Sequence, residues 1–219
     1  MHSINYNGKT YTTDHLGYIN DFKQWDEGFP EGMAIGVRIA NKLTKEHWDI
    51  IRHIREEYVK NKSCPNVYET CHAIGIGLNE LKQLFPTGYQ RGACKLAGIT
   101  YGEIPSSAAR LFDPESGSAI AIDGSEYPVN AFGFLNDPAK WDERFARYLA
   151  QKAKIPGGKL TEKHWEVISY LRKIYSEREI VPTIYETCDA LRMDIDELES
   201  LFPDGYHSGA IKLAGLRIR

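Results

Sequence analysis

The sequence contains two copies of one pattern, and this repeat constrains the fold more than any other feature. Residues 84–98 read LFPTGYQRGACKLAG, and residues 201–215 read LFPDGYHSGAIKLAG. Upstream, LTKEHWDIIRHIREEY at 43–58 returns as LTEKHWEVISYLRKIY at 160–175. An internal period of about a hundred residues predicts two similar domains in tandem. A residue kept in both copies is expected to serve the fold, whereas a residue found in one copy is a better candidate for chemistry.

Composition and charge indicate an ordinary globular protein and narrow its partners. Hydrophobic residues make up 42% and charged residues 26% of the 219 positions, which allows each copy its own core. The net charge of -3 does not favour nucleic acid as a partner, although Lys212, Arg217 and Arg219 form a local basic patch. No apolar run is long enough to cross a membrane, and the polar start MHSINYNGKTY is unlike a signal peptide. We therefore expect a cytoplasmic protein without a membrane partner.

The start of each copy predicts a small β-meander. The dipeptides NG at 7–8 and DG at 123–124 stand between alternating apolar runs, and both favour the two-residue type I′ hairpin turn. Gly17 and Gly133 mark a second turn. The stretch that follows differs between the copies, since it is rich in Gly and Pro in the first and helical in pattern in the second.

Helical patterns fill the rest of each copy. After Thr44 and Thr161, apolar residues recur at helical spacing and predict a long amphipathic helix. Histidine stands three positions after each threonine, so the usual capping box is not expected. In the first copy, shorter helices are predicted to begin at Pro65 and near Asn79, and a last helix to cover 88–98 and end at its final glycine. The fold class is therefore α+β, with two similar domains that each pack a β-meander on about five helices.

The stretch between the copies is predicted to be a linker. Residues 100–119 read TYGEIPSSAARLFDPESGSA, which is rich in Ser, Pro, Gly and Ala. The expected boundaries are a first domain at 1–104, a linker at 105–119 and a second domain at 120–219. In this division the first residues after the last helix form a short C-terminal arm of the first domain.

Cys94 is the leading candidate for chemistry. It occurs in the first copy only, because Ile211 holds its place in the second. If the last helix forms, Arg91 lies one turn before Cys94 and Lys95 lies beside it, and nearby cations favour the nucleophilic thiolate. The second copy also replaces Arg91, by Ser208, as expected if this cation serves the thiol. The alternative is that Cys94 is a small buried hydrophobic residue, which Ile211 shows the position tolerates.

The other three cysteines favour structural roles. Cys71 and Cys188 occupy the same position in both copies and are interpreted as buried core residues. Cys64 aligns with Val181 and is interpreted as a core or partly exposed filler. A disulfide between Cys64 and Cys71 is an alternative that the context does not support, because cysteines in a chain without a leader are expected to stay reduced.

His47 and His164 precede a tryptophan in both copies and are also interpreted as structural. A helix N-terminus disfavours a charged imidazolium, so each is expected to be neutral and hydrogen-bonded. The sequence has no CxxC pair, no Cys/His spacing for zinc, and no nucleotide-binding, hydrolase or zincin motif. We therefore expect no metal and no cofactor, and an enzyme with its own active site is the least favoured hypothesis.

These residues resemble a known family. Each copy resembles the DsrC/TusE family, the gamma-subunit-like proteins of dissimilatory sulfite reduction and the sulfur-relay proteins of tRNA thiolation. The resemblance spans nearly all of both copies and rests on GYI at 17–19, DFKQW at 21–25, the long helix at 43–58, Pro65, and LFPTGYQRGACKLAG at 84–98. It implies a β-meander on a helical array with a helix-turn-helix-like core. It also implies partners among sulfite reductase-like or sulfur-relay proteins.

The resemblance further implies sulfur chemistry, but one of the two cysteines that this chemistry uses is missing from the chain. In the family, a mobile C-terminal arm ends in a cysteine that carries persulfide sulfur, and many DsrC members share sulfur between it and an upstream cysteine as a trisulfide. Cys94 matches the upstream cysteine, and Arg91 stands where a lysine is common. The arm cysteine has no match, since Pro105 lies near its place in the first copy and the second copy ends at LRIR. The two-cysteine mechanism is therefore not expected.

Two functional hypotheses follow. The first is a sulfur-trafficking protein that accepts or relays persulfide sulfur, or forms a mixed disulfide, at Cys94. Its activity would be that of a sulfurtransferase at most, and the second copy would serve as a scaffold. The alternative is a non-catalytic regulatory module that binds a protein of sulfur metabolism or, less favoured, DNA. An exposed Cys94 favours the first hypothesis, and a buried one the second.

Overall fold

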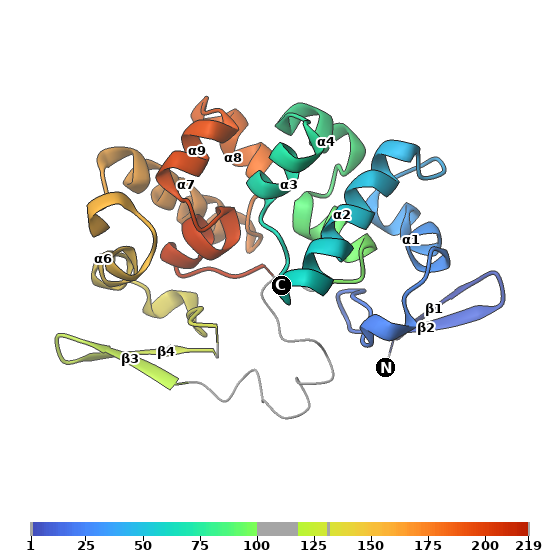
Figure 1. The fold of residues 1–219 in the computed structure, drawn as a ribbon. Coiled ribbons are helices and arrows are strands. Elements are labelled where there is room, and N and C mark those ends of the chain that lie inside the picture. Colours follow the sequence, from blue (N-terminus) through green and yellow to red (C-terminus); the bar gives the residue numbers. More distant parts are fainter. Residues whose placement is uncertain (1, 100–117, 131, 219) are drawn as a thin grey trace. The chain divides into compact units, whose positions relative to one another are not determined.

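The computed structural model describes residues 2–99, 118–130 and 132–218 (Figure 1). The chain divides into two compact units, Met1–Leu111 and Phe112–Arg219, called unit 1 and unit 2 below. Of the predicted linker, Ser118 and Ala119 belong to a strand, and its other residues lie outside the described ranges. Within those ranges, no helix combines the length and the apolar character that a bilayer span needs.

Both units place a β-hairpin before a series of helices, which confirms the α+β class and the two similar domains (Figure 1). Unit 1 contains β1 (His2–Tyr6), β2 (Lys9–Thr13), η1 (Phe22–Gln24), α1 (Gly28–Met33), η2 (Ile35–Val37), α2 (Lys45–Asn61), α3 (Val67–Ile74), α4 (Leu78–Leu84) and η3 (Tyr89–Cys94). Unit 2 contains β3 (Ser118–Ile122), β4 (Ser125–Val129), η4 (Pro138–Lys140), α6 (Glu143–Lys152), η5 (Pro156–Gly158), α7 (Glu162–Arg178), α8 (Ile184–Leu191), α9 (Ile195–Leu201) and η6 (Tyr206–Ile211). As the sequence predicts, α6 is longer than the Gly- and Pro-containing α1.

The hairpin turns have the geometry that their dipeptides predict. Asn7 and Gly8 adopt φ angles of 48° and 80°, and Asp123 and Gly124 adopt 47° and 79°. Positive φ at both central positions defines a type I′ turn, which matches the right-handed twist of the strands. One isolated antiparallel bridge continues each hairpin, so the predicted meander consists of two strands and a single bridge.

The helices α2 and α7 begin with a cap that the sequence does not predict. The Nδ1 atom of His47 accepts a hydrogen bond from the backbone N–H of Thr44 at 3.1 Å, and His164 accepts one from Thr161 at 3.1 Å. The imidazole therefore takes the place of the Glu or Gln side chain in a capping box. The Nε2 atom of His47 lies 2.9 Å from the carbonyl oxygen of Leu84, and burial lowers the pKa of both histidines. The expected neutral, hydrogen-bonded histidine is confirmed.

The long helix of each unit supplies the centre of its core. In unit 1 the completely buried side chains include Ile50, Ile51 and Ile54 of α2, together with Leu81, Phe85 and Leu96. In unit 2 they include Val167, Ile168 and Leu171 of α7, together with Leu198 and, each at 1% exposed, Phe202 and Leu213. Burial of this apolar stripe is the main favourable contribution to the stability of each unit.

The last helix of each unit is wound as a π-helix, whereas the sequence predicts an ordinary helix. The N–H of Lys95 points to the carbonyl of Gln90, five residues back, and η6 repeats this arrangement. The segment closes at Gly98, which has a φ angle of 68° and provides the expected left-handed cap. The wider winding brings residues further apart in sequence into register than an α-helix does.

Candidate functional site

Cys94, the leading candidate, lies in the core of unit 1. It is the last residue of the π-helical segment η3, and its side chain is 0% exposed. Ile211 is the last residue of η6 in unit 2 and is also 0% exposed. The position is therefore a core position in both units, as the structural alternative predicts, and only unit 1 places a thiol there.

A second thiol contacts Cys94. The Sγ atoms of Cys64 and Cys94 are 3.5 Å apart, although thirty residues separate them along the chain. Cys64 lies in the irregular segment between α2 and α3, and its side chain is half-buried. All four cysteines lie in described ranges and none of them is in a disulfide, with Cys71 and Cys188 buried as expected. The neighbour of Cys64 is thus Cys94, and the alternative pairing with Cys71 is not formed.

The surroundings of Cys94 raise the pKa of its thiol well above the usual value. Burial is the largest cause, followed by the hydrogen bond and the charge of Cys64. The hydroxyl of Tyr89 acts in the opposite direction through a hydrogen bond to the sulfur. The thiol is therefore protonated at neutral pH in this packed conformation, and protonated thiols are poor nucleophiles.

The two cations predicted to assist Cys94 are Arg91 and Lys95, and Lys95 makes a structural contact of its own. The Nζ atom of Lys95 donates to the carbonyl of Leu16 at 2.7 Å, which ties η3 to the turn after the hairpin. Lys212 holds the same place in unit 2, where Ile211 stands beside it instead of a thiol, so the lysine has a structural role there. Assistance by Arg91 and Lys95 in a more open conformation stays a prediction.

A buried tyrosine holds the segment that carries Cys64 against η3. The hydroxyl of Tyr89 donates to the carbonyl of Pro65 at 2.9 Å and lies 2.7 Å from Oγ1 of Thr70. Tyr206 makes the same two contacts in unit 2, at 2.9 Å to the carbonyl of Pro182 and 2.7 Å to Oγ1 of Thr187. Because both units keep this network, it belongs to the fold. In unit 1 it also fixes the distance between the two thiols.

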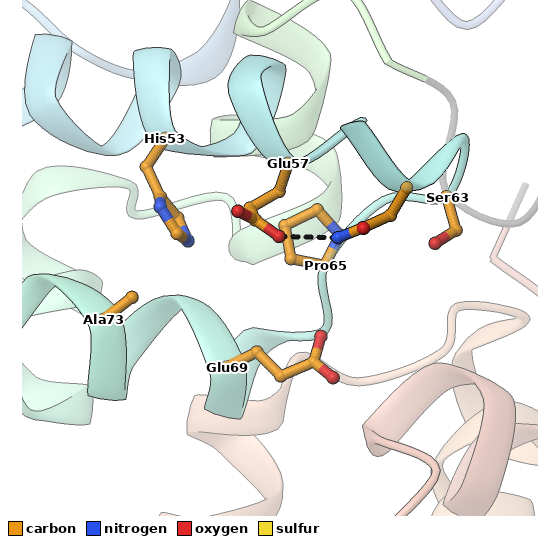
Figure 2. A pocket seen from close by; sticks show the side chains of 7 residues that line it. His53, Glu57, Ser63, Pro65, Glu69 and Ala73 are labelled. Carbon is orange, nitrogen blue, oxygen red and sulfur yellow. Dashed lines mark hydrogen bonds between the residues drawn. The ribbon is translucent and has the colours of Figure 1, made fainter. Parts of the chain in front are cut away.

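An open pocket of about 490 Å³ lies beside the same segment (Figure 2). Figure 2 shows it between α2 and α3, and its lining residues are His53, Glu57, Asn61, Ser63, Pro65, Glu69 and Ala73. The Glu57 carboxylate is engaged, since it accepts a hydrogen bond from Asn61 at 2.6 Å. Ser63 and Pro65 are the chain neighbours of Cys64, so the pocket brings solvent next to the backbone that carries this thiol.

Cys64 was interpreted from the sequence as a filler, although comparison of the two copies contains evidence for a further role. Cys64 aligns with Val181 and Cys94 aligns with Ile211, so both thiols disappear together in unit 2. Val181 and Ile211 are 4% and 0% exposed. The fold therefore accepts aliphatic side chains at both positions, and unit 1 alone adds sulfur chemistry to them.

Comparisons with known proteins assign each unit to one family. A family model described as "DsrC like protein" matches residues 5–103 and again residues 121–218. A sulfurtransferase TusE of Photorhabdus laumondii is 35% identical over 104 residues, covering 44% of this chain and 91% of that protein. The gamma subunit of the dissimilatory-type sulfite reductase of Nitratidesulfovibrio vulgaris is 31% identical over 99 residues, covering 45% and 93%. The crystal structure of the oxidized gamma-subunit (DsrC) from Archaeoglobus fulgidus is 29% identical and covers 47% and 97%, with a TM-score of 0.43.

Proposed function

The chain belongs to the DsrC-like family as a tandem duplication, and we propose that it acts in sulfur relay with its thiol chemistry confined to unit 1. The observation that supports this most directly is the difference between the units, since the position of Cys94 in unit 1 is occupied by Ile211 in unit 2. The relatives named sulfurtransferase TusE and sulfite reductase gamma subunit favour partners among the proteins of sulfur metabolism. We expect the reaction to take place in the cytoplasm, where thiols stay reduced.

In the proposed reaction Cys94 accepts persulfide sulfur. Its thiolate attacks the outer sulfur of a donor persulfide R–S–SH, which yields Cys94–S–SH and releases R–S⁻. The released R–S⁻ takes up the proton that the Cys94 thiol lost, so the donor leaves as R–SH. Attack on a disulfide instead yields a mixed disulfide at the same sulfur. Because Cys94 is buried and its pKa is raised, either reaction requires local opening of residues 84–98. Sulfur uptake is therefore expected to be slower than uptake by an exposed thiol.

Intact mass spectrometry tests this proposal. The full chain is incubated with a small-molecule persulfide donor, and a gain of one sulfur atom is expected on the wild type. Peptide mapping is expected to place the sulfur on Cys94. The variant Cys94→Ile, which carries the residue that unit 2 has at this position, should fold and gain no sulfur there. A wild type without an adduct, or an equal adduct on Cys94→Ile and Cys94→Ser, would contradict the proposal.

The burial of Cys94 favours a second candidate, a non-catalytic module that binds a protein of sulfur metabolism. Such a module would use the family surface and would need no accessible thiol. Binding to a sulfite reductase-like or sulfur-relay protein that is unchanged by Cys94→Ile, in a chain that takes up no sulfur, would support this candidate. Failure to bind either partner would count against it. DNA is the less favoured partner because the net charge is -3, and a mobility-shift assay tests it.

A further inference from the structure

Two thiols in unit 1 are in contact without being bonded. The Sγ atoms of Cys64 and Cys94 lie 3.5 Å apart, and both residues are free cysteines. A disulfide holds its sulfur atoms about 2.05 Å apart, so an approach of about 1.5 Å would close the bond. We propose that Cys64 and Cys94 form a dithiol site, which a low-molecular-weight disulfide such as oxidised glutathione converts reversibly to an intramolecular disulfide.

The different environments of the two thiols set the order in which they react. Cys64 is half-buried and lies in neither helix nor strand, between the left-handed cap Lys62, with a φ of 57°, and Pro65. Cys94 is completely buried and held in the backbone of η3. In the packed conformation an incoming disulfide therefore meets Cys64 first, since direct reaction at Cys94 requires the opening of residues 84–98. Cys64 is also the residue that moves to close the bond. Cys94 acts as the resolving thiol from inside the core.

The reaction proceeds by two thiol–disulfide exchanges. The Cys64 thiolate attacks R–S–S–R, forms Cys64–S–S–R and releases one R–S⁻. Sγ of Cys94 then attacks Sγ of Cys64, forms the Cys64–Cys94 bond and releases the second R–S⁻. Each R–S⁻ takes up one of the two protons that the cysteines lose, so two R–SH are formed and the protein loses two electrons. The first step also removes the charge and hydrogen bond of Cys64, two of the causes that raise the pKa of Cys94.

The second unit shows that packing alone does not require these thiols. Val181 and Ile211 occupy the two equivalent positions and are buried. A pair of aliphatic side chains therefore fills the same space in the same fold, and unit 1 has two contacting thiols instead. The disulfide is expected whether or not Cys94 takes up persulfide sulfur, because its oxidant contains no persulfide. Failure of the sulfur relay and failure of the dithiol site can thus be told apart.

Glutathione redox buffers test the dithiol site on the full chain. After equilibration the protein is acid-quenched, alkylated under denaturing conditions and digested. Oxidising buffers are expected to remove two hydrogen atoms, join the peptides of Cys64 and Cys94, and leave Cys71 and Cys188 alkylated; dithiothreitol should reverse the change. A Cys64–Cys71 crosslink would overturn the proposal. So would a glutathione adduct that persists on Cys64 of the wild type, or four alkylated cysteines in the most oxidising buffer.

Variants distinguish loss of the dithiol site from loss of the fold, and they test which thiol reacts first. Cys64→Val combined with Cys94→Ile copies the side chains of unit 2, so it is expected to keep the circular dichroism spectrum and the melting temperature of the reduced wild type without forming the crosslink. In Cys94→Ser, no thiol resolves the first intermediate, and a glutathione adduct should accumulate on Cys64. An adduct on Cys94 in Cys64→Ser, with none on Cys64 in Cys94→Ser, would overturn the assigned order.

Discussion

At the scale of single residues, unit 2 has a buried histidine at a position where unit 1 has a glutamine. Unit 2 has His207 where unit 1 has Gln90, and His207 is 8% exposed with its ring centroid 4.6 Å from that of Phe134. Burial, assisted by the charge of Lys212, lowers the pKa of His207 to about 3. An unfolded histidine has a pKa of about 6.5. The neutral side chain therefore contributes stability that is present above pH ~6.5 and is lost as the pH falls towards 3.

The variant His207→Gln should remove this pH dependence. Over the window where the unfolded chain binds one extra proton, the free energy of unfolding falls by about 1.4 kcal/mol per pH unit. Between pH 7 and pH 5 we expect the wild type to lose about 2 kcal/mol more than His207→Gln. Urea unfolding of both proteins at the two pH values measures this difference, and His47 and His164 cancel because both proteins contain them. Equal losses in the two proteins would contradict it.

Gly98 is a residue that the fold requires. Its φ angle is 68°, and a Cβ atom there would lie 2.5 Å from Cδ1 of Trp25. Positive φ and overpacking together should make Gly98→Ala less stable by about 2 to 4 kcal/mol. Gly75→Ala is the matched control, since Gly75 has a φ of 76° but nothing within 4 Å of the added carbon. Its free energy of unfolding, measured by calorimetry, should fall by only about 1 kcal/mol. An equal loss in both variants would show that the contact with Trp25 does not contribute.

At the scale of elements, a half-buried arginine joins each long helix to the segment after the π-helix. The guanidinium of Arg55 lies 3.6 Å from the ring centroid of Trp25 and donates to the carbonyl of Ala97 at 2.6 Å. Arg172 lies 4.0 Å from the ring centroid of Trp141 in unit 2. Burial lowers the pKa of Arg55 to about 10, which leaves it charged at neutral pH. Since both units keep the arrangement, it serves the fold.

The variants Arg55→Lys and Arg172→Lys should each lower stability. Lysine keeps the charge but lacks the planar group that stacks on tryptophan and reaches the carbonyl, so the expected loss is about 1 to 2 kcal/mol in urea unfolding. Arg52→Lys is the control, because Arg52 is largely exposed, pairs with Glu27 on the surface and lies further from a tryptophan ring, 5.5 Å from the centroid of Trp48. Its expected change is below about 0.5 kcal/mol. Similar losses at positions 52 and 55 would show that the closer stacking and the burial of Arg55 contribute nothing.

The elements that the sequence predicts well are those whose signals are local. Two adjacent residues determine each hairpin turn, and the apolar stripe of α2 lies within one helix. The start of α3 is less well predicted, since the helix begins at Val67 with Asn66 as its cap, two residues after Pro65. The histidine cap of α2 and the π-helical winding of η3 were missed, because the first depends on the carbonyl of Leu84 in another helix and the second on tertiary packing.

In the candidate site too, the features with a signal in the sequence were predicted and those that depend on tertiary contacts were not. Comparison of the two copies indicated Cys94, because the difference from Ile211 is visible in the sequence. Its burial was one of the two alternatives that the sequence left open, whereas its contact with Cys64 was not predicted. These residues are far apart in sequence and are brought together only by the packing of η3 against the α2–α3 connection. The linked loss of both thiols in unit 2 is the pattern that could have revealed the pair.

At the scale of the whole molecule, one fold is used twice with different side chains at a few buried positions. The tyrosine network, the histidine caps and the stacked arginines are common to both units. The pairs Cys64/Val181 and Cys94/Ile211 differ, and so does Arg91/Ser208. The shared contacts fix the same backbone geometry in both units. Cysteines introduced at positions 181 and 211 of unit 2 should therefore contact each other as Cys64 and Cys94 do in unit 1.

The double variant Val181→Cys with Ile211→Cys tests whether the fold alone creates the dithiol site. In oxidising glutathione buffer it should lose four hydrogen atoms and show a second crosslink, between positions 181 and 211. The expected midpoint is close to that of Cys64–Cys94, because the potential depends on geometry and burial that the units share. A second pair that stays reduced would show that unit 1 supplies something further, and Ser208→Arg would then test Arg91. The same variants can be incubated with the persulfide donor. If Cys at position 211 takes up sulfur while Ser208 is unchanged, uptake needs no arginine. If it takes up sulfur only when Ser208→Arg is added, Arg91 takes part in the reaction of unit 1.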